Sequence, residues 1–583
     1  MKEAGIIGKL RRDRDSRVIA FYFLAAFVFG LILIRGYGVY WDYEDEASIL
    51  WWNMHEFAVN LCGENSWLAG KFSHLIVPSL EQEKDHGIAI YYPAAPFLYK
   101  AFGYWRYFVW RISVFIVFFL SALGIFFSAK TIYRSRKLAC FLFSVYLFAP
   151  IPFAYGHLDN KDIGFLSMSV LTLLGALKWA RCDMGGGKKQ RIHRLKWILF
   201  FSLAAALAAN CKILGILFWG MGVVYVMLYQ LMRQGTSDGG SPPRNGKEWA
   251  GIFGKIILAA AAGFLLCFFV ITPAAWRHPI DYAIFVIRSV FRFVRWGGMV
   301  KFAGTIYSEG ETPWYYLGGM IVLTTPVFIL LLILAGHLEV IRTAAASVMK
   351  KRSGAGQREH TLNMIYLFLL WLIPFLYGSF GDDIIYDEWR HFFFLWGYLV
   401  LIGGAGALRL ADFAEKIAGK IAGKLRPDAS GTARRVPAWI GTACVLYLIL
   451  LILTGHPYEY AYTNVFAGPN AGERYQIDYW QISFDSAMRR LCAMDEGERN
   501  TELELSVGGA DYYFNGFAVD YTYRSLHPAF QQKIIPGGQD ANYLFRSVTY
   551  DGIAQLVDLS GYHLLFTIRA YGNDIMGVWE KNQ

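Results

Sequence analysis

Residues 107–129 read YFVWRISVFIVFFLSALGIFFSA and contain one charged side chain, Arg111. A helix of about 20 apolar residues crosses the hydrocarbon core of a bilayer, so this stretch predicts a membrane-spanning helix. Ten further runs of the same character bring the predicted spans to eleven. The eleven runs lie at 18–37, 107–129, 138–155, 162–180, 196–210, 212–232, 254–275, 315–336, 362–379, 391–409 and 437–455.

Only Asn210, Cys211 and Lys212 separate the fifth run from the sixth. The two runs are therefore either two full spans or one broken pair that re-enters the membrane, and the sequence leaves both open. The first run lacks the small-residue cleavage site of a signal peptide, so we count it as a retained span.

The composition fits this class. Of 583 residues, 55% are hydrophobic and 17% are charged, against about 25% charged in a typical soluble domain. Such a chain is neither disordered nor a small disulfide-rich protein. The predicted fold is an α-helical polytopic membrane protein with a water-exposed portion.

The net charge of +11 is explained by basic residues that collect on one side of the membrane. If the N-terminus is cytoplasmic, six cytoplasmic segments hold 33 of the 56 Lys and Arg, as the positive-inside rule requires. These segments are 1–17, 130–137, 178–196, 233–255, 338–360 and 409–435. Their expected partner is anionic membrane lipid rather than nucleic acid.

The same topology places the end of the chain outside. We divide the chain into a membrane domain, 1–455, and an extracytoplasmic domain, 456–583. Strand-like runs at 502–507 and 563–568, with turn signals such as Asn515-Gly516, predict a small α/β domain there.

Polar residues concentrate in the outside loops. The first, 38–106, carries Asp42, Glu44, Asp45 and Glu46 just beyond a span. This acidic edge predicts a general base or a divalent-cation site, or else a solvated loop, and its spacing matches no particular ligand set. The second outside loop is short and holds five polar residues, which again suggest a site rather than a plain turn. They are His157, Asp159, Asn160, Lys161 and Asp162.

Basic side chains stand at outer helix ends. Arg111 lies one turn into a span, where an unpaired charge is costly, so it predicts an anionic partner. Lys212 either snorkels to the surface or binds phosphate. Arg390 and His391 follow Asp387, and the three form either a phosphate grip or a local ion pair. Around residue 290, three arginines share one face of an expected interfacial helix, which would meet the anionic headgroups of either bulk lipid or a lipid-phosphate substrate. They are Arg288, Arg292 and Arg295.

Several motifs together resemble the bacterial membrane glycosyltransferases of the GT-C superfamily, which includes protein O-mannosyltransferases and aminoarabinose lipid A transferases. The matching segments run in order along nearly the whole chain. They are 38–42, 150–163, 312–316, 324–326, 386–391, 456–464 and 478–480.

The resemblance implies a GT-C fold and transfer of a sugar from a polyprenyl-phosphate donor to a lipid, glycan or protein acceptor. It further implies the bacterial inner membrane as the location and a first-loop aspartate as general base, with inversion of the anomeric carbon. Lys212, Arg390 and His391 would then stabilise the leaving phosphate, and the second loop would hold the sugar or order the first loop. The C-terminal domain would guide acceptors or cap the site.

One departure from the family concerns the base. The family usually has Trp-Asp-Glu, whereas here Tyr43 follows Asp42, and a second acidic pair, Asp45 and Glu46, comes three residues later. Ungapped alignment gives Asp42 as the base, and a small shift gives Asp45. Two other functions stay open, a transporter or flippase of a lipid-linked sugar and a non-catalytic assembly subunit. The transporter is less favoured because the charges lie at outer helix ends rather than near the midplane.

Overall fold

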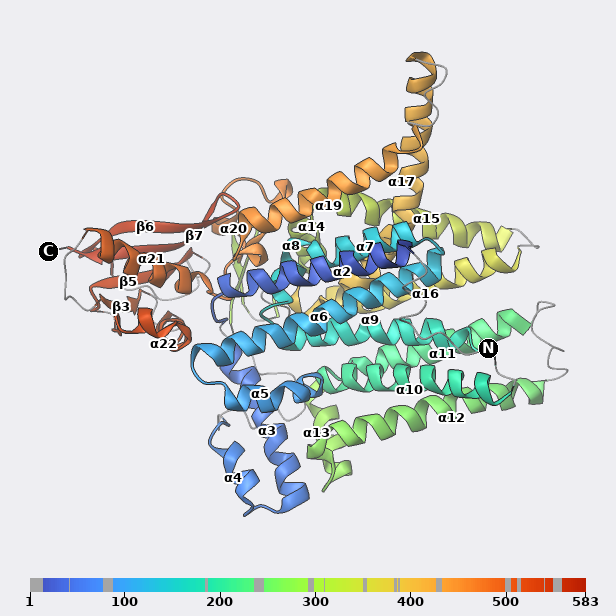
Figure 1. Ribbon diagram of the computed structural model, residues 1–583, viewed down its shortest axis with the longest axis horizontal. Coiled ribbons are helices and arrows are strands. Elements are labelled where there is room, and N and C mark those ends of the chain that lie inside the picture. Colours follow the sequence, from blue (N-terminus) through green and yellow to red (C-terminus); the bar gives the residue numbers. More distant parts are fainter. Residues whose placement is uncertain are drawn as a thin grey trace.

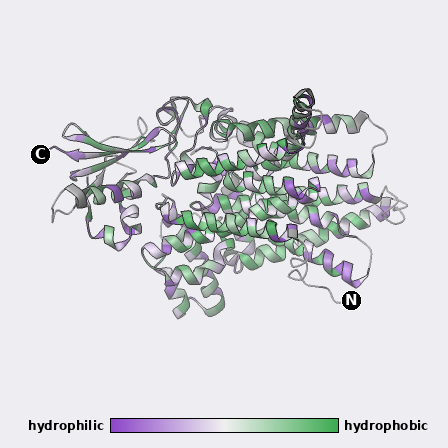
Figure 2. Cartoon of the chain, turned by 45° about the horizontal axis from the view of Figure 1, so that its top comes forward, coloured by the Kyte–Doolittle hydropathy of each residue, from purple (hydrophilic) through white to green (hydrophobic). Residues whose placement is uncertain are grey.

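The computed structural model describes residues 14–40, 42–76, 87–183, 187–234, 246–291, 298–308, 310–349, 354–381, 385, 388–425, 433–498, 505–510, 515–538, 540–548 and 558–582. Long helices run side by side along the molecule, and a mixed sheet lies beyond one end of them (Figure 1). We call this end the sheet end of the bundle. Hydrophobic residues dominate the helices (Figure 2). The helical polytopic class with a small C-terminal α/β part is confirmed.

Ten helices within the described residues are long and apolar enough to cross a membrane. They are α2 (Arg14–Leu33), α6 (Tyr104–Tyr133), α9 (Asn160–Ala180), α10 (Lys188–Cys211), α11 (Gly215–Gln234), α12 (Gly246–Ile271), α15 (Val327–Met349), α16 (Ala355–Phe380), α17 (Leu395–Leu425) and α19 (Val436–Gly455). Because α10 and α11 are both of full length, the fifth and sixth runs are two spans rather than a re-entrant pair.

Prolines change two of the predicted spans. The run 138–155 forms two helices, α7 (Arg136–Phe148) and α8 (Pro150–Tyr155). Ala149 between them is extended, since the residue before a proline avoids the helical region. The predicted span 315–336 is likewise α14 (Tyr316–Thr324) followed by α15, which begins after Pro326 and continues to Met349.

Short elements cover the sheet end. The first outside loop forms α3 (Tyr43–Cys62), α4 (Trp67–Ser73), η3 (Ala89–Ala94) and α5 (Ala95–Lys100). After α12 come η4 (Pro273–Ala275), α13 (Pro279–Phe291) and the hairpin of β1 (Val300–Phe302) with β2 (Thr305–Tyr307). Arg288 lies in α13, as the expected interfacial helix requires, whereas Arg292 and Arg295 lie outside the described residues.

The C-terminal sheet has the strand order β4-β3-β5-β7-β6. β3 pairs in parallel with β4 and β5, and β7 pairs antiparallel with β5 and β6. Its strands are β3 (Leu505–Gly509), β4 (Ile534–Pro536), β5 (Tyr543–Ser547), β6 (Tyr562–Ala570) and β7 (Asn573–Lys581). The helices of this part are α20 (Ala471–Arg474), α21 (Ser483–Glu498), α22 (Asn515–Ser525) and α23 (Pro528–Gln531). The strand-like runs therefore match β3 and β6, and the α/β expectation is confirmed.

Residues beyond Gly455 are tied to the helix ends. The Asn464 side-chain amide donates to the carbonyls of Val322 (2.6 Å) and Thr325 (2.7 Å), which α14 leaves without helical partners where it breaks. Tyr571 similarly donates to the carbonyl of Leu451 in α19 (2.8 Å). The division of the chain at 455/456 stays a prediction.

Candidate functional site

An ion pair joins the first outside loop to the loop before α17. The Arg390 guanidinium donates to Oδ2 of Asp42 at 2.9 Å, although 348 positions separate the two residues. The arginine side chain is 8% exposed and that of Asp42 is 26% exposed, so solvent reaches the carboxylate. Arg390 also lies over the rings of Trp480, 4.7 Å from the ring centroid, and Tyr479. These aromatic faces hold the guanidinium in place by cation–π attraction.

The loop before α17 turns sharply to present Arg390. Glu388 adopts a left-handed conformation (φ 63°), and its backbone N–H donates to the Tyr316 hydroxyl at 3.1 Å. The Trp389 indole donates to the Thr324 hydroxyl at 2.9 Å. The two residues that precede Arg390 therefore each bind α14 and hold the loop against it.

A second ion pair lies beside the first. Lys212, which ends α10 in an extended conformation, pairs with Asp162 in the first turn of α9. Its ammonium group also lies 3.5 Å from the carbonyl of His391. Asp159 caps α9 by accepting the Asp162 backbone N–H at 2.9 Å, a standard N-cap bond. Lys212 thus connects the α10–α11 junction to both the second outside loop and the loop before α17.

Four predicted clusters therefore meet at the sheet end. Asp42 comes from the first loop, Asp159 and Asp162 from the second, Lys212 from the α10–α11 junction, and Arg390 with His391 from the loop before α17. We call these six residues the charged site. Burial, together with the cations Arg390 and Lys212, holds the pKa of His391 well below its usual range, so its imidazole is neutral near pH 7.

Glu46 is buried next to the charged site. It accepts a hydrogen bond from the Tyr40 hydroxyl, which itself accepts the Trp110 indole N–H at 3.2 Å. Burial, with a smaller effect from Asp42, raises the pKa of Glu46 to about 8. Burial also raises the pKa of Asp159, and Asp162 and Glu46 add to that rise. Glu46 therefore keeps its proton at neutral pH.

Two of the predicted residues have structural partners instead. Arg111 donates to the carbonyl of Gly38 at 2.7 Å, which fixes the start of the first loop. His157 is stacked between Phe115 and Tyr37, and its ring nitrogens face the carbonyls of Phe153 (2.8 Å) and Gly30 (3.2 Å). Their role in donor binding stays a prediction, because every contact named here is made within the protein.

The remaining predicted residues occupy different environments. Asp45 is exposed on α3, and Lys161 is half-buried at the start of α9. Asn160 is the first residue of α9, and Asp387 lies outside the described residues. Among the described residues, no group of three or more His, Cys, Asp or Glu side chains is placed to hold a metal ion.

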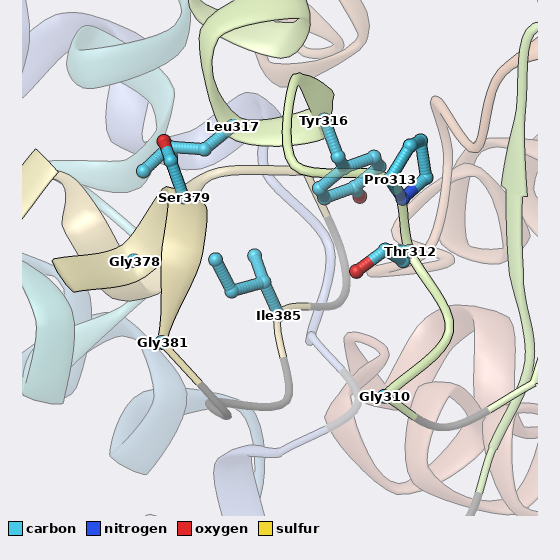
Figure 3. Close-up of a pocket in the computed structure, with 9 residues that line it drawn as sticks. All are labelled: Gly310, Thr312, Pro313, Tyr316, Leu317, Gly378, Ser379, Gly381 and Ile385. Atoms are coloured by element: carbon cyan, nitrogen blue, oxygen red, sulfur yellow. The ribbon is translucent and has the colours of Figure 1, made fainter. Parts of the chain in front are cut away.

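A small cavity of about 170 Å³ opens beside the loop that carries Arg390. Figure 3 shows it between the N-terminal end of α14, the C-terminal end of α16 and Ile385. Among the described residues that line it, Thr312, Ser379 and Tyr316 carry side-chain hydroxyls.

Three further residues at the site have roles that the sequence alone does not indicate. Trp480 and Tyr479 support Arg390, and Tyr40 binds Glu46. All three stand in motifs that carry the family resemblance or beside them. Nothing local in the sequence indicates that a Tyr-Trp pair about 90 positions downstream packs on Arg390.

The raised pKa of Glu46 predicts a pH-dependent stability. The folded state keeps a proton on Glu46 up to about pH 8, whereas the unfolded chain loses it near the ordinary value of 4.5. Stability from this group is therefore complete below about pH 4.5 and falls as pH rises toward 8, by up to about 1.4 kcal/mol per pH unit. Glu46→Gln keeps an acceptor for Tyr40 and removes this slope.

Thermal unfolding of the detergent-solubilised protein between pH 5 and 8 measures the effect. The melting temperature of the wild type should fall more steeply with pH than that of Glu46→Gln. Asp478, whose pKa burial also raises, has no electrostatic contribution from Glu46 and affects both proteins equally. The part of the rise in the Asp159 pKa that comes from Glu46 is lost in the variant, which adds to the difference between the two curves. Parallel curves would contradict a protonated Glu46.

The fold and the site together define a multi-pass membrane protein with a charged, partly solvent-accessible site at one end of its helices. No protein-family model matches the chain, and no curated protein matches its sequence. Among solved structures it is similar to ArnT from Cupriavidus metallidurans in the apo state, with 10% identity over 97% of this chain and 98% of that chain (TM-score 0.45). The same protein bound to undecaprenyl phosphate matches with 12% identity over 96% and 97% of the two chains (TM-score 0.42).

A third similar structure is the archaeal oligosaccharyltransferase AglB from Archaeoglobus fulgidus, in complex with an inhibitory peptide and a dolichol-phosphate. It shares 11% identity over 91% of this chain and 70% of that chain (TM-score 0.39). At TM-scores below 0.5 these likenesses carry no weight for the activity, which rests on the site itself.

Proposed function

We propose that this protein is a membrane glycosyltransferase that moves a sugar from a polyprenyl-phosphate donor to an acceptor at the extracytoplasmic face. The observation that carries the proposal is the charged site, in which an accessible carboxylate, Asp42, stands beside two cations, Arg390 and Lys212. A base for the acceptor and fixed positive charge for a leaving phosphate are what this transfer requires.

In the proposed reaction, Asp42 acts as the base, and Arg390 and Lys212 bind the phosphate. Asp42 takes the proton of the acceptor hydroxyl or amine while the acceptor attacks the anomeric carbon and inverts it. The bond between that carbon and the phosphate oxygen breaks, and its electron pair leaves with the polyprenyl phosphate. Arg390 and Lys212 stabilise the charge that develops there.

An apolar groove supplies a place for the polyprenyl chain. A cavity of about 500 Å³ lies between α11 and α16, and its lining begins at Ile216, one turn beyond Lys212. From Ile216 to Leu228 it follows α11 for about 18 Å. A phosphate held at Lys212 would therefore pass its tail directly into hydrocarbon-like surroundings. Trp219, Val224, Leu369 and Ile373 line this groove.

A bulky side chain in the groove should raise the KM for donors with a long polyprenyl chain. Val224 is 49% exposed and lines the groove, so Val224→Trp occupies space that an isoprene unit would use. We expect the KM for a long-chain donor to rise about tenfold, since roughly 1.4 kcal/mol of tail burial is lost. The KM for a donor with a two-isoprene chain should change little.

Leu231→Trp is the matched control, because Leu231 is also exposed on α11 but is not part of the groove lining. Steady-state kinetics with short and long donors measure both variants. Equal effects of the two tryptophans, or equal effects on both donors, would refute a tail site in this groove.

Labelled transfer tests the function itself. Membranes containing the protein are supplied with polyprenyl-phosphate donors that carry radiolabelled sugars, and the label is followed into lipid, glycan and protein fractions. Transfer above that of membranes lacking the protein supports the proposal. Movement of labelled donor across the bilayer without transfer would overturn it in favour of a transporter.

We further propose a bacterial inner-membrane location with the N-terminus in the cytoplasm and the sheet end outside. A periplasm-dependent reporter fused after Asn464, which binds α14 at the sheet end, tests the orientation. Reporter activity is expected only outside the cytoplasm. An inactive fusion of normal abundance, together with an active cytoplasm-dependent reporter fused at the same position, would place the charged site on the wrong face for this donor.

A further inference from the structure

Helix α17 is longer than a membrane span. Its 31 residues extend for about 46 Å, against about 30 Å for a hydrocarbon core. Residues 395–406 are buried among the other helices, whereas 408–410 and most of the turns that follow are exposed. Figure 1 shows the far end of α17 projecting away from the bundle, across the direction of the neighbouring helices.

The projecting part has one apolar face. Leu410, Phe413, Ile417 and Ile421 follow one another at spacings of three and four, so they lie along a single stripe. All four are exposed, and Phe413 is 61% exposed. A stripe of this size left in water would be costly, which indicates that something apolar covers it.

The charges around the stripe are arranged by sign. At 100° per residue, Arg409, Lys416 and Lys420 fall on one flank of the stripe, and Asp412 and Glu415 fall on the opposite side of the helix. Lys416 also pairs with Asp412 at 2.7 Å on the solvent side. Lysines beside an apolar face, with acids turned away from it, are typical of helices that lie in a membrane interface.

We propose that residues 408–421 of α17 lie along the cytoplasmic membrane surface, with the apolar stripe in the acyl-chain boundary and the basic flank on anionic headgroups. The stripe continues directly from the part of the same helix that lies within the bundle, so bilayer reaches it without another protein. The orientation proposed above puts this end in the cytoplasm, where the leaflet is negatively charged. A partner protein would need acidic groups matched to the basic flank.

Depth-dependent quenching tests the placement. The full chain is reconstituted in vesicles of phosphatidylcholine and phosphatidylglycerol, with a fluorescent amino acid incorporated at 413 or 417. The matched controls carry it at 412 or 415. Doxyl-labelled lipids should quench 413 and 417, and aqueous iodide should quench 412 and 415. Protection of 413 from both quenchers would mean that a second copy covers the stripe and would overturn the proposal, as would iodide quenching at all four positions.

Two charge-neutralising variants test the headgroup contact separately. Headgroup-labelled phosphatidylglycerol should quench position 417 more than labelled phosphatidylcholine does. Lys416→Gln and Lys420→Gln should each lower this preference roughly fivefold, in line with the attraction of one basic residue to an anionic surface. An unchanged preference would remove the anionic lipid from the proposal. These readouts need no transferase activity, so their outcome is independent of the proposed function.

Discussion

Asp42→Asn should lower the turnover of sugar transfer by about 100- to 10,000-fold, the usual contribution of a positioned general base. Asparagine has nearly the same shape and still offers an oxygen to the Arg390 guanidinium, so the 2.9 Å contact can persist. The change therefore removes the proton acceptor and leaves the loop in place. The KM for the donor should change little, because the donor phosphate is held by Arg390 and Lys212.

Asp45→Asn is the matched control, and it also decides between the two alignments of the acidic motif. Asp45 is exposed on α3, whereas Asp42 is the carboxylate that contacts Arg390. We expect near wild-type turnover from Asp45→Asn. Initial rates at saturating donor, measured for wild type and both variants, give the answer. Full activity in Asp42→Asn would remove Asp42 from the base role, and a large loss in Asp45→Asn alone would transfer that role to Asp45.

Hydrophobicity predicted the membrane helices well because each span must satisfy its backbone internally, and a long apolar run leaves few alternatives. It failed where proline intervened. Neither Pro150 nor Pro326 interrupts the apolar character of its run, yet each forces the preceding residue out of the helical region. The break at Pro326 is then stabilised by Asn464, which is more than 130 positions away. No local pattern reports such a partner.

The charged site was predictable in part, because the membrane helices fix which loops lie at the same end of the molecule. Topology put several polar clusters on one face, and four of them do meet in the Asp42–Arg390 and Lys212–Asp162 pairs. Arg111 was the least predictable. An arginine inside a span must have a partner, but the sequence cannot tell a substrate anion from the Gly38 carbonyl that it contacts.

Lys212→Met should abolish transfer and also destabilise the protein. The lysine lies 15% exposed against Asp162, which is 5% exposed, so removing it leaves a buried carboxylate without its cation. Breaking a buried pair in this way costs about 3–5 kcal/mol. A loss of activity in this variant alone is therefore ambiguous, because misfolding would produce it too.

A double variant separates the two effects. In Lys212→Met with Asp162→Asn, the stranded charge is gone, and the melting temperature should recover most of what the single variant loses. Transfer should stay absent, since the leaving phosphate still lacks its cation. The rise in melting temperature that the donor produces should also be largely lost in the double variant. Asp162→Asn alone keeps Lys212, so it should keep part of the transfer activity. If the double variant regains both stability and transfer, Lys212 serves only to neutralise Asp162, and Arg390 alone must hold the phosphate.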